Sequence, residues 1–215
     1  MAISPIFSKS GEGMFATYSY NEVASGSGII EFYCALDQSS NGILTTSSIY
    51  SDKIFTKVAM NADTTQYYKT IDYDFDMNIN IPLNLKGITY VNVPFGFSQT
   101  TSGGGEGGFI YVITRLRKWD GASETEIANG TSRIFDNLTS PQLPYTFLIK
   151  FDTPFTHYKK GETLRLTIEM WSKLHGTNDP KYSYLGHDPQ DRTWTGASPI
   201  NPSQLKAYIP TKIDL

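Results

Sequence analysis

The sequence predicts an all-β fold, an antiparallel β-sandwich of the jelly-roll type with about ten strands. Apolar and polar residues alternate with a period of two in many segments, turn dipeptides containing glycine separate these segments, and helical periodicity is nearly absent. Aromatic residues make up 13% of the chain, which also holds 18 glycines and 11 prolines. This composition is typical of sheets joined by tight turns.

The chain order of these segments predicts one domain. Residues 1–13 are small and polar and predict a flexible arm, and residues 14–215 are expected to form a single β-sandwich. The expected strands are 14–20, 28–36, 53–60, 71–85, 87–97, 108–119, 125–128, 132–135, 145–152, 162–171 and 204–215. Hairpin-type turns are expected at Asn41-Gly42, Lys86-Gly87, Asp120-Gly121, Asn129-Gly130 and Lys160-Gly161. The polar loops 37–52, 98–107 and 172–203 are the expected places for function.

The most regular segment is Ile71 to Leu85, IDYDFDMNINIPLNL, in which every odd position is apolar and every even position is Asp, Asn or Pro. Same-face neighbours on a strand lie about 6.6 Å apart, so one metal ion cannot collect three carboxylates from this segment. The pattern predicts a core strand whose acidic reverse face is solvated or meets a basic neighbour. Pro82 predicts an edge, a bulge or a break near its end.

Charge and composition exclude several classes of protein. A net charge of -3 and a pI near 5.6 argue against a nucleic-acid partner, which would require a basic surface. Cys34 is the single cysteine, so no intrachain disulfide can form, and its apolar surroundings predict a buried side chain. The sequence shows no signal-peptide pattern and no 18-residue apolar run, so we expect synthesis in the cytoplasm and no membrane span.

The glycine-rich stretch Ser98 to Gly108, SQTTSGGGEGG, precedes a predicted strand rather than a helix. It therefore lacks the context of a phosphate-binding loop and predicts a hairpin or an arm that orders on contact. Its candidate contact residues are Gly103, Gly104, Gly105 and Glu106.

The loop from Ser172 to Gly196 collects histidines and carboxylates. These residues are His175, Asp179, His187, Asp188 and Asp191. Their spacing matches no zinc or iron motif, so a solvated loop that makes contacts is the favoured interpretation. We expect neither a metal nor a cofactor.

No catalytic constellation stands out in the sequence. A Gly-x-Ser-x-Gly elbow is absent, and carboxylates such as Glu124, Glu126, Glu162 and Glu169 do not form a distinctive pair. We therefore expect no catalytic residues and a protein that is not an enzyme. A hydrolase on the same scaffold stays an alternative, and it would require two carboxylates that converge in a deep cleft.

The second half of the chain resembles a known class of proteins. The segments YVITRLRKWDGASETEIANGTS, TPFTHYKKGETLRLTIEMW and SQLKAYIPTKIDL resemble jelly-roll virion proteins of tailed bacteriophages, the capsid cement or decoration proteins. The resemblance implies a structural protein on the capsid surface, made in the host cytoplasm, that binds the major capsid protein and copies of itself and stabilises the head. The glycine-rich stretch and the N-terminal arm would then be contact elements.

An alternative from another class is a carbohydrate-binding module or a receptor-binding fibre head. Its binding residues would be aromatic side chains exposed in the long loop, namely Trp194 with Tyr182 or Tyr184. Trp119 and Trp171 end predicted strands and are more simply core or rim residues.

Overall fold

The fold is built of β-strands throughout the part of the chain that the structure describes. The structure is a computed structural model that describes residues 27–60, 66–99, 107–137, 142–175, 181–193 and 202–212. Its strands are β1 (Ser27–Leu36), β2 (Gly42–Thr45), β3 (Phe55–Ala59), β4 (Tyr68–Asn78), β5 (Leu83–Gln99), β6 (Gly107–Trp119), β7 (Glu124–Thr131), β8 (Phe135–Asn137), β9 (Gln142–Tyr158), β10 (Thr163–His175), β11 (Lys181–Gly186) and β12 (Lys206–Lys212). The predicted all-β, mostly antiparallel fold is confirmed.

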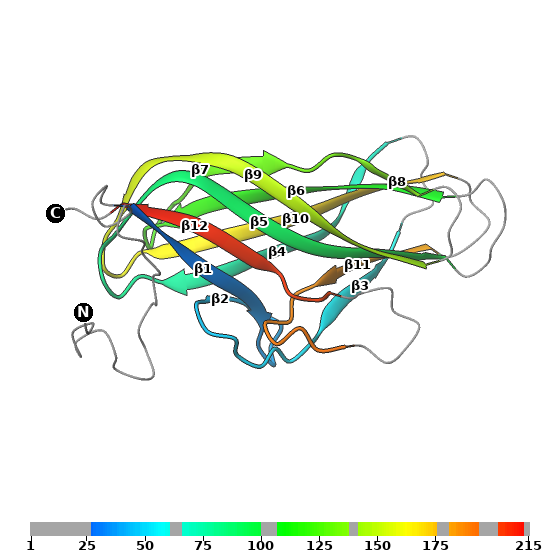
Figure 1. The fold of residues 1–215 in the computed structure, drawn as a ribbon, viewed down its shortest axis with the longest axis horizontal. Coiled ribbons are helices and arrows are strands. Elements are labelled where there is room, and N and C mark those ends of the chain that lie inside the picture. The colour runs from blue at the N-terminus through cyan, green and yellow to red at the C-terminus, as the bar shows by residue number, and fades with distance from the viewer. Residues whose placement is uncertain are drawn as a thin grey trace, which may run out of the picture.

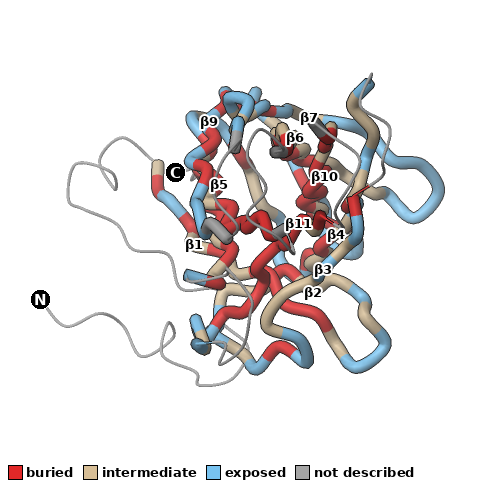
Figure 2. The backbone as a smooth tube through the Cα atoms, turned by 90° about the vertical axis from the view of Figure 1, so that its right-hand side faces the viewer, coloured by how far each residue is buried: buried red, intermediate tan, exposed pale blue. Residues whose placement is uncertain are grey.

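The strands form two layers that face each other across the core (Figures 1 and 2). The continuous order of neighbours is β3-β11-β5-β12-β1-β2-β4-β10-β6-β7, with β8 paired to β6 and β9 paired to β5. All pairings are antiparallel except a short parallel one between β2 and β4, which joins the two layers along one edge. At the opposite edge the outermost strands are β7 and β9, which are not neighbours in the sheet.

The core lies between the layers, where alternate residues of each strand point inward. Phe75 of β4, Leu166 of β10 and Leu116 of β6 are all 0% exposed and occupy directly paired positions. Cys34 is also fully buried, and burial raises the pKa of its thiol well above the usual value. The prediction of a buried Cys34 is therefore confirmed.

The segment 71–85 is not one strand, as predicted, but the end of β4, a turn and the start of β5. The break falls at residues 79–82, so the interruption expected from Pro82 is confirmed. Ile79 nevertheless stays in the core at 2% exposed, and its N–H donates to the carbonyl of Glu162 at 2.8 Å. The apolar side chain thus continues the inward row although the strand has ended.

Turn signals predicted the strand connections only in part. Asp120-Gly121 and Lys160-Gly161 form turns as expected, with φ of 97° at Gly121 and 91° at Gly161. The antiparallel β1–β2 connection is present as expected, but its turn precedes Asn41-Gly42, with φ of 64° at Ser40, and Gly42 is already the first residue of β2.

Two of the expected turns are wrong. Lys86-Gly87 is a bulge inside β5, where Gly87 has φ of 132°. Asn129-Gly130 lies inside β7, so residues 125–128 and 132–135 do not form the predicted hairpin. A Cβ at Gly130 would lie 2.7 Å from Cδ1 of Phe151, so this glycine serves close packing of β7 on β9 rather than a turn.

Two strands were missed because they lie in stretches predicted to be loops. β2 lies within the predicted loop 37–52 and β11 within the predicted loop 172–203. The expected segment 14–20 and the arm 1–13 lie outside the described residues, and the division into arm and domain stays a prediction. Within the described ranges, no helix has the length and apolar character needed to cross a membrane.

Candidate functional site

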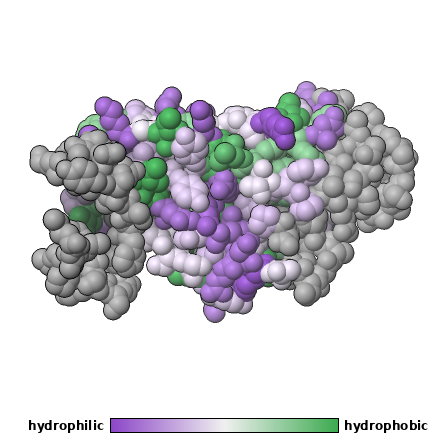
Figure 3. Space-filling model, viewed as in Figure 1, coloured by the Kyte–Doolittle hydropathy of each residue, from purple (hydrophilic) through white to green (hydrophobic). Residues whose placement is uncertain are grey.

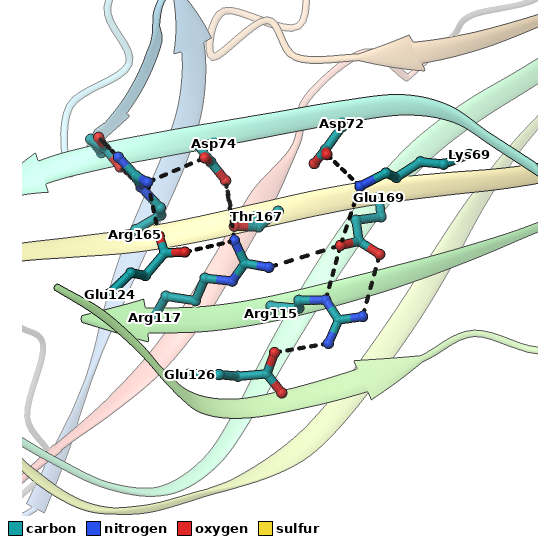
Figure 4. Close-up of polar contacts among 11 residues, drawn as sticks. Lys69, Asp72, Asp74, Arg115, Arg117, Glu124, Glu126, Arg165, Thr167 and Glu169 are labelled. Atoms are coloured by element: carbon teal, nitrogen blue, oxygen red, sulfur yellow. Dashed lines mark hydrogen bonds and ion pairs between the residues drawn. The ribbon is translucent and has the colours of Figure 1, made fainter. Parts of the chain in front are cut away.

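The outer face of β4, β10, β6 and β7 carries a continuous network of charged side chains (Figure 4). The inward row of β4 is apolar, so Asp72, Asp74 and Asp76 all project from the opposite face. The same face of the neighbouring strands presents basic residues. The network comprises the acids Asp72, Asp74, Asp76, Glu124, Glu126 and Glu169 and the bases Lys69, Arg115, Arg117 and Arg165. The acidic face predicted from the sequence therefore meets basic neighbours from its own chain.

Arg165 lies at one end of this network. Its Nε and Nη2 donate to the two carboxylate oxygens of Asp76, each at 2.7 Å, and its Nη1 donates to Glu124 at 2.8 Å. The hydrogen bonds from Arg165 to Asp76 are the main reason that the pKa of Arg165 is raised, although burial opposes the shift. A fork of this kind fixes both side chains in one orientation.

Glu169 is the most buried carboxylate of the network, at 4% exposed. It accepts hydrogen bonds from Nε of Arg115 at 3.0 Å and from Nε1 of Trp171 at 3.1 Å. Burial by itself would raise the pKa of Glu169, but these hydrogen bonds and the nearby positive charges outweigh burial and lower it. Glu169 is consequently ionised and satisfied at neutral pH.

Arg117 lies between the two ends of the network. It is 3.1 Å from Glu124 and 3.9 Å from Glu169. Six acids and four bases leave the face with an excess of negative charge, while the arginine side chains are only 20 to 23% exposed. The guanidinium groups are thus largely covered and held by ion pairs, so the charged area is ordered.

Aromatic side chains adjoin the network at the other end. Trp171 stacks on Tyr111 with ring centroids 6.2 Å apart, and Tyr67 meets Tyr111 edge-on at 5.1 Å. Trp171 is half-buried on the outer face, which agrees with its prediction as a rim residue. The face therefore combines a rigid charged area with an aromatic patch formed by Tyr67, Tyr111 and Trp171.

A hydroxyl–imidazole pair lies elsewhere, where β3 meets the end of β11. Nε2 of His187 is 3.0 Å from Oγ1 of Thr56, which is also hydrogen-bonded to the hydroxyl of Tyr73 at 3.2 Å. His187 is fully buried, and burial lowers its pKa to about 4. Among the described residues, Nδ1 of His187 has no hydrogen-bond partner, whereas a catalytic base of this kind is oriented by a third group.

The histidine and carboxylates of the loop 172–196 whose side chains the structure describes, His187, Asp188 and Asp191, have separate roles. Asp188 is fully buried and accepts from Arg192, whereas Asp191 accepts from the backbone N–H of Ser203. His175 ends β10, and Asp179 lies outside the described residues. In the described ranges, no group of three or more His, Cys, Asp or Glu is arranged to hold a metal ion.

The predicted contact residues lie in other surroundings than expected. Tyr182 and Tyr184 are on β11 and not in a polar loop. Tyr182 lies under Nζ of Lys57 at 3.9 Å, and Tyr184 is 3% exposed with its hydroxyl 2.9 Å from Oγ of Ser98. A tyrosine as buried as Tyr184 does not fit the prediction of an exposed binding residue. Gly103, Gly104, Gly105, Glu106 and Trp194 lie outside the described residues.

No protein family model matches the chain, and no curated protein matches its sequence. Solved structures do resemble its fold. An α-amino acid ester hydrolase matches at a TM-score of 0.52 with 11% identity, over 85% of this chain and 36% of that chain. A CocE/NonD family hydrolase from Staphylococcus aureus covers 84% of this chain and 41% of its own length at 14% identity, with a TM-score of 0.37.

A virus protein also resembles the fold, but weakly. The VP2 subviral particle of infectious bursal disease virus matches 84% of this chain and 42% of that chain at 12% identity, with a TM-score of 0.27. A score this low carries no argument. The resemblance to phage cement proteins thus has no support beyond a coarse all-β likeness.

These comparisons contradict the predictions of a capsid cement protein and of a protein that is not an enzyme. Of the three structures, the one with a TM-score above 0.5 is a hydrolase, and its low identity establishes a likeness of fold alone. The chain spans about a third to two fifths of the length of the two hydrolases.

Proposed function

We propose that this chain is the β-sandwich domain of a hydrolase. The observation that carries the proposal is the agreement of 85% of the chain with one part, 36%, of an α-amino acid ester hydrolase. A β-sandwich that matches a fraction of a larger enzyme suggests a module that works together with other parts of the enzyme. Esters of α-amino acids are the substrate class that the name of that hydrolase suggests, and they are the first to test.

The charged face offers a surface for packing against the rest of such an enzyme. Interfaces between domains are more polar than permanent interfaces between subunits, and the outer face of β4, β10, β6 and β7 carries a network of charged side chains over much of its area. Its side chains already hold one another in place, so little side-chain entropy would be lost on contact. The aromatic patch of Tyr67, Tyr111 and Trp171 supplies the residue types that contribute most to binding.

Ester hydrolysis by the native assembly tests the proposal. A tagged copy of the full chain is purified from the organism that encodes it, and the release of acid from an α-amino acid methyl ester is measured. We expect hydrolysis by a complex that contains the chain. The double variant Tyr111→Ala/Trp171→Ala weakens the surface proposed to contact the rest of the enzyme, so material purified with it is expected to show no hydrolysis. Material purified with the control Lys150→Gln on β9 is expected to hydrolyse the ester as the parent does.

The remaining outcomes also decide the matter. Hydrolysis by the isolated chain would place the chemistry in this chain and overturn its role as a supporting domain. Absence of hydrolysis from both the isolated chain and its complexes would overturn the proposal of a hydrolase.

A further inference from the structure

A pocket of about 360 Å³ opens at the free edge of the sandwich, where β7 and β8 of one layer approach β9 of the other. Four aromatic residues line it, Phe95 from β5, Phe135 from β8, and Tyr145 and Phe147 from β9. The rest of the wall includes Ser132 and Arg133, which connect β7 to β8. Its volume falls within the range of about 300 to 1,000 Å³ that small-molecule sites occupy.

The aromatic walls are ordered by their own contacts. Phe95 and Phe147 are stacked with ring centroids 4.1 Å apart and planes within 4° of parallel. Phe135 and Tyr145 are also 4.1 Å apart, and Phe135 meets Phe95 edge-on at 5.3 Å. Phe95 is 0% exposed and belongs to the hydrophobic core, so the aromatic cluster is continuous with the core. A flat apolar ring entering the pocket would meet surfaces that need no rearrangement.

Arg133 is the one charged residue among those that line the pocket. Its guanidinium forms no ion pair or hydrogen bond with another residue in the described ranges, in contrast to the arginines of the charged face. The hydroxyl of Ser132 is already used, because it accepts from the N–H of Val112 and donates to the carbonyl of Arg133. The hydroxyls of Tyr145 and Thr146 also lie at the pocket, but the charged group that is free to meet a ligand there is positive.

Exposed apolar side chains surround the same place. Leu148 is 67% exposed and Tyr145 is 36% exposed, both at the pocket, and Ile134, between two lining residues, is 54% exposed. Elsewhere hydrophobic and hydrophilic residues are interspersed over the face shown in Figure 3. A gathering of large exposed apolar residues around a concave site is typical of a binding surface.

We propose that this pocket binds a small ligand that combines a flat apolar ring with a negative charge, such as an aromatic carboxylate or sulfonate. The ring lies against the cluster of Phe95, Phe135, Tyr145 and Phe147, and the anion pairs with Arg133. This binding function goes beyond the proposed function, because it concerns the opposite side of the layer from the charged face and requires no hydrolysis.

Anilinonaphthalene sulfonate is the probe for the test, because it has aromatic rings and one negative charge and fluoresces on binding. N-phenyl-1-naphthylamine has similar rings without the charge. Binding of both probes to the full folded chain is followed by fluorescence titration. We expect stoichiometric binding of the sulfonate, weakened about tenfold by Arg133→Gln, as for the loss of one charge-assisted contact.

Matched controls distinguish binding in the pocket from nonspecific apolar adsorption of the probe and from nonspecific attraction to positive charge. Lys150→Gln removes one positive charge from β9 outside the pocket and is expected to leave sulfonate binding unchanged. Arg133→Gln is expected to leave binding of the uncharged naphthylamine unchanged, and Arg133→Lys to restore part of the sulfonate affinity. The proposal is overturned if the sulfonate does not bind stoichiometrically, if Arg133→Gln binds it as well as the parent, or if Lys150→Gln weakens it equally.

Discussion

Arg165 on β10 lies directly opposite Asp76 on β4, and two hydrogen bonds of 2.7 Å join the guanidinium to both carboxylate oxygens. The third nitrogen of Arg165 reaches across β6 to Glu124 on β7 at 2.8 Å. One side chain thus connects three strands of the layer. Because a slip of one residue would move Asp76 to the other face, this contact also specifies the register of β4 against β10.

We expect a measurable coupling between Arg165 and Asp76. In a double-mutant cycle of Arg165→Leu and Asp76→Leu, the coupling is expected to be about 1 kcal/mol, which is reduced by the partial exposure of both side chains. Urea unfolding of the four proteins measures it. Lys150→Leu, on the exposed face of β9, is expected to change the free energy of unfolding by less than about 0.5 kcal/mol. Additive effects within error would contradict the prediction.

Glu169→Gln is expected to destabilise the fold by roughly 1 to 3 kcal/mol at pH 7, because the buried side chain loses the charge that Arg115 and Trp171 stabilise. The pKa of Glu169 is lowered in the folded state from 4.5. Its stabilising contribution is therefore present above about pH 4.5 and is lost as the pH falls further, so the parent and the variant should converge in acid. Chemical unfolding between pH 3 and pH 7 tests this, and a difference that does not depend on pH would count against it.

The free energy of unfolding is also expected to depend on pH through His187, a base that burial keeps neutral, whereas Glu169 is an acid that its partners keep charged. The pKa of His187 falls from 6.5 to about 4 in the folded protein, so between these values the unfolded chain binds a proton that the folded chain does not. Stability is expected to fall by about 2 kcal/mol from pH 6.5 to pH 5 on this account. His187→Gln, which keeps a hydrogen-bonding group near Thr56, should lose this part of the pH dependence. An unchanged slope of the melting temperature against pH in the variant would show that another group is responsible.

Gly42 and Gly121 differ in the reason that each needs to be glycine. A Cβ at Gly42 would lie 2.0 Å from the carbonyl oxygen of Asp74, a backbone atom that cannot move without opening the β2–β4 pairing. At Gly121 nothing lies within 4 Å, and the cost of alanine is the strain of φ at 97° alone. We expect Gly121→Ala to cost about 1 kcal/mol and Gly42→Ala more than about 3 kcal/mol. Thermal unfolding compares them, and equal costs would contradict the prediction.

The sequence predicted the all-β class because alternation is a local property of each strand. The inward row of Ile71 and Phe75 and the break near Pro82 were both visible in this way. Gly87 and Gly130 were misread as turns because glycine also serves bulges and close packing, and these uses depend on partner strands that the sequence does not identify.

The rows of charged residues on the charged face could be predicted from the sequence, but their pairing could not. The row of Asp72, Asp74 and Asp76 was evident, and alternating arginines at Arg115 and Arg117 give a similar signal on another segment. Which rows meet depends on the pairing of β4, β10 and β6, a matter of topology rather than local pattern. The pocket was missed for the same reason, since Phe95 of β5 meets aromatic residues of β8 and β9 that lie about 40 or more positions later in the chain.

The position of β12 has a consequence for synthesis of the protein. β12 pairs with β1 on one side and with β5 on the other, so the last described strand to leave the ribosome fills a place between two strands made much earlier. Until then both β1 and β5 present a free backbone edge to the solvent, and such edges favour pairing with other chains. Translation that stalls before Lys206 would consequently yield nascent chains that depend on chaperones to avoid aggregation.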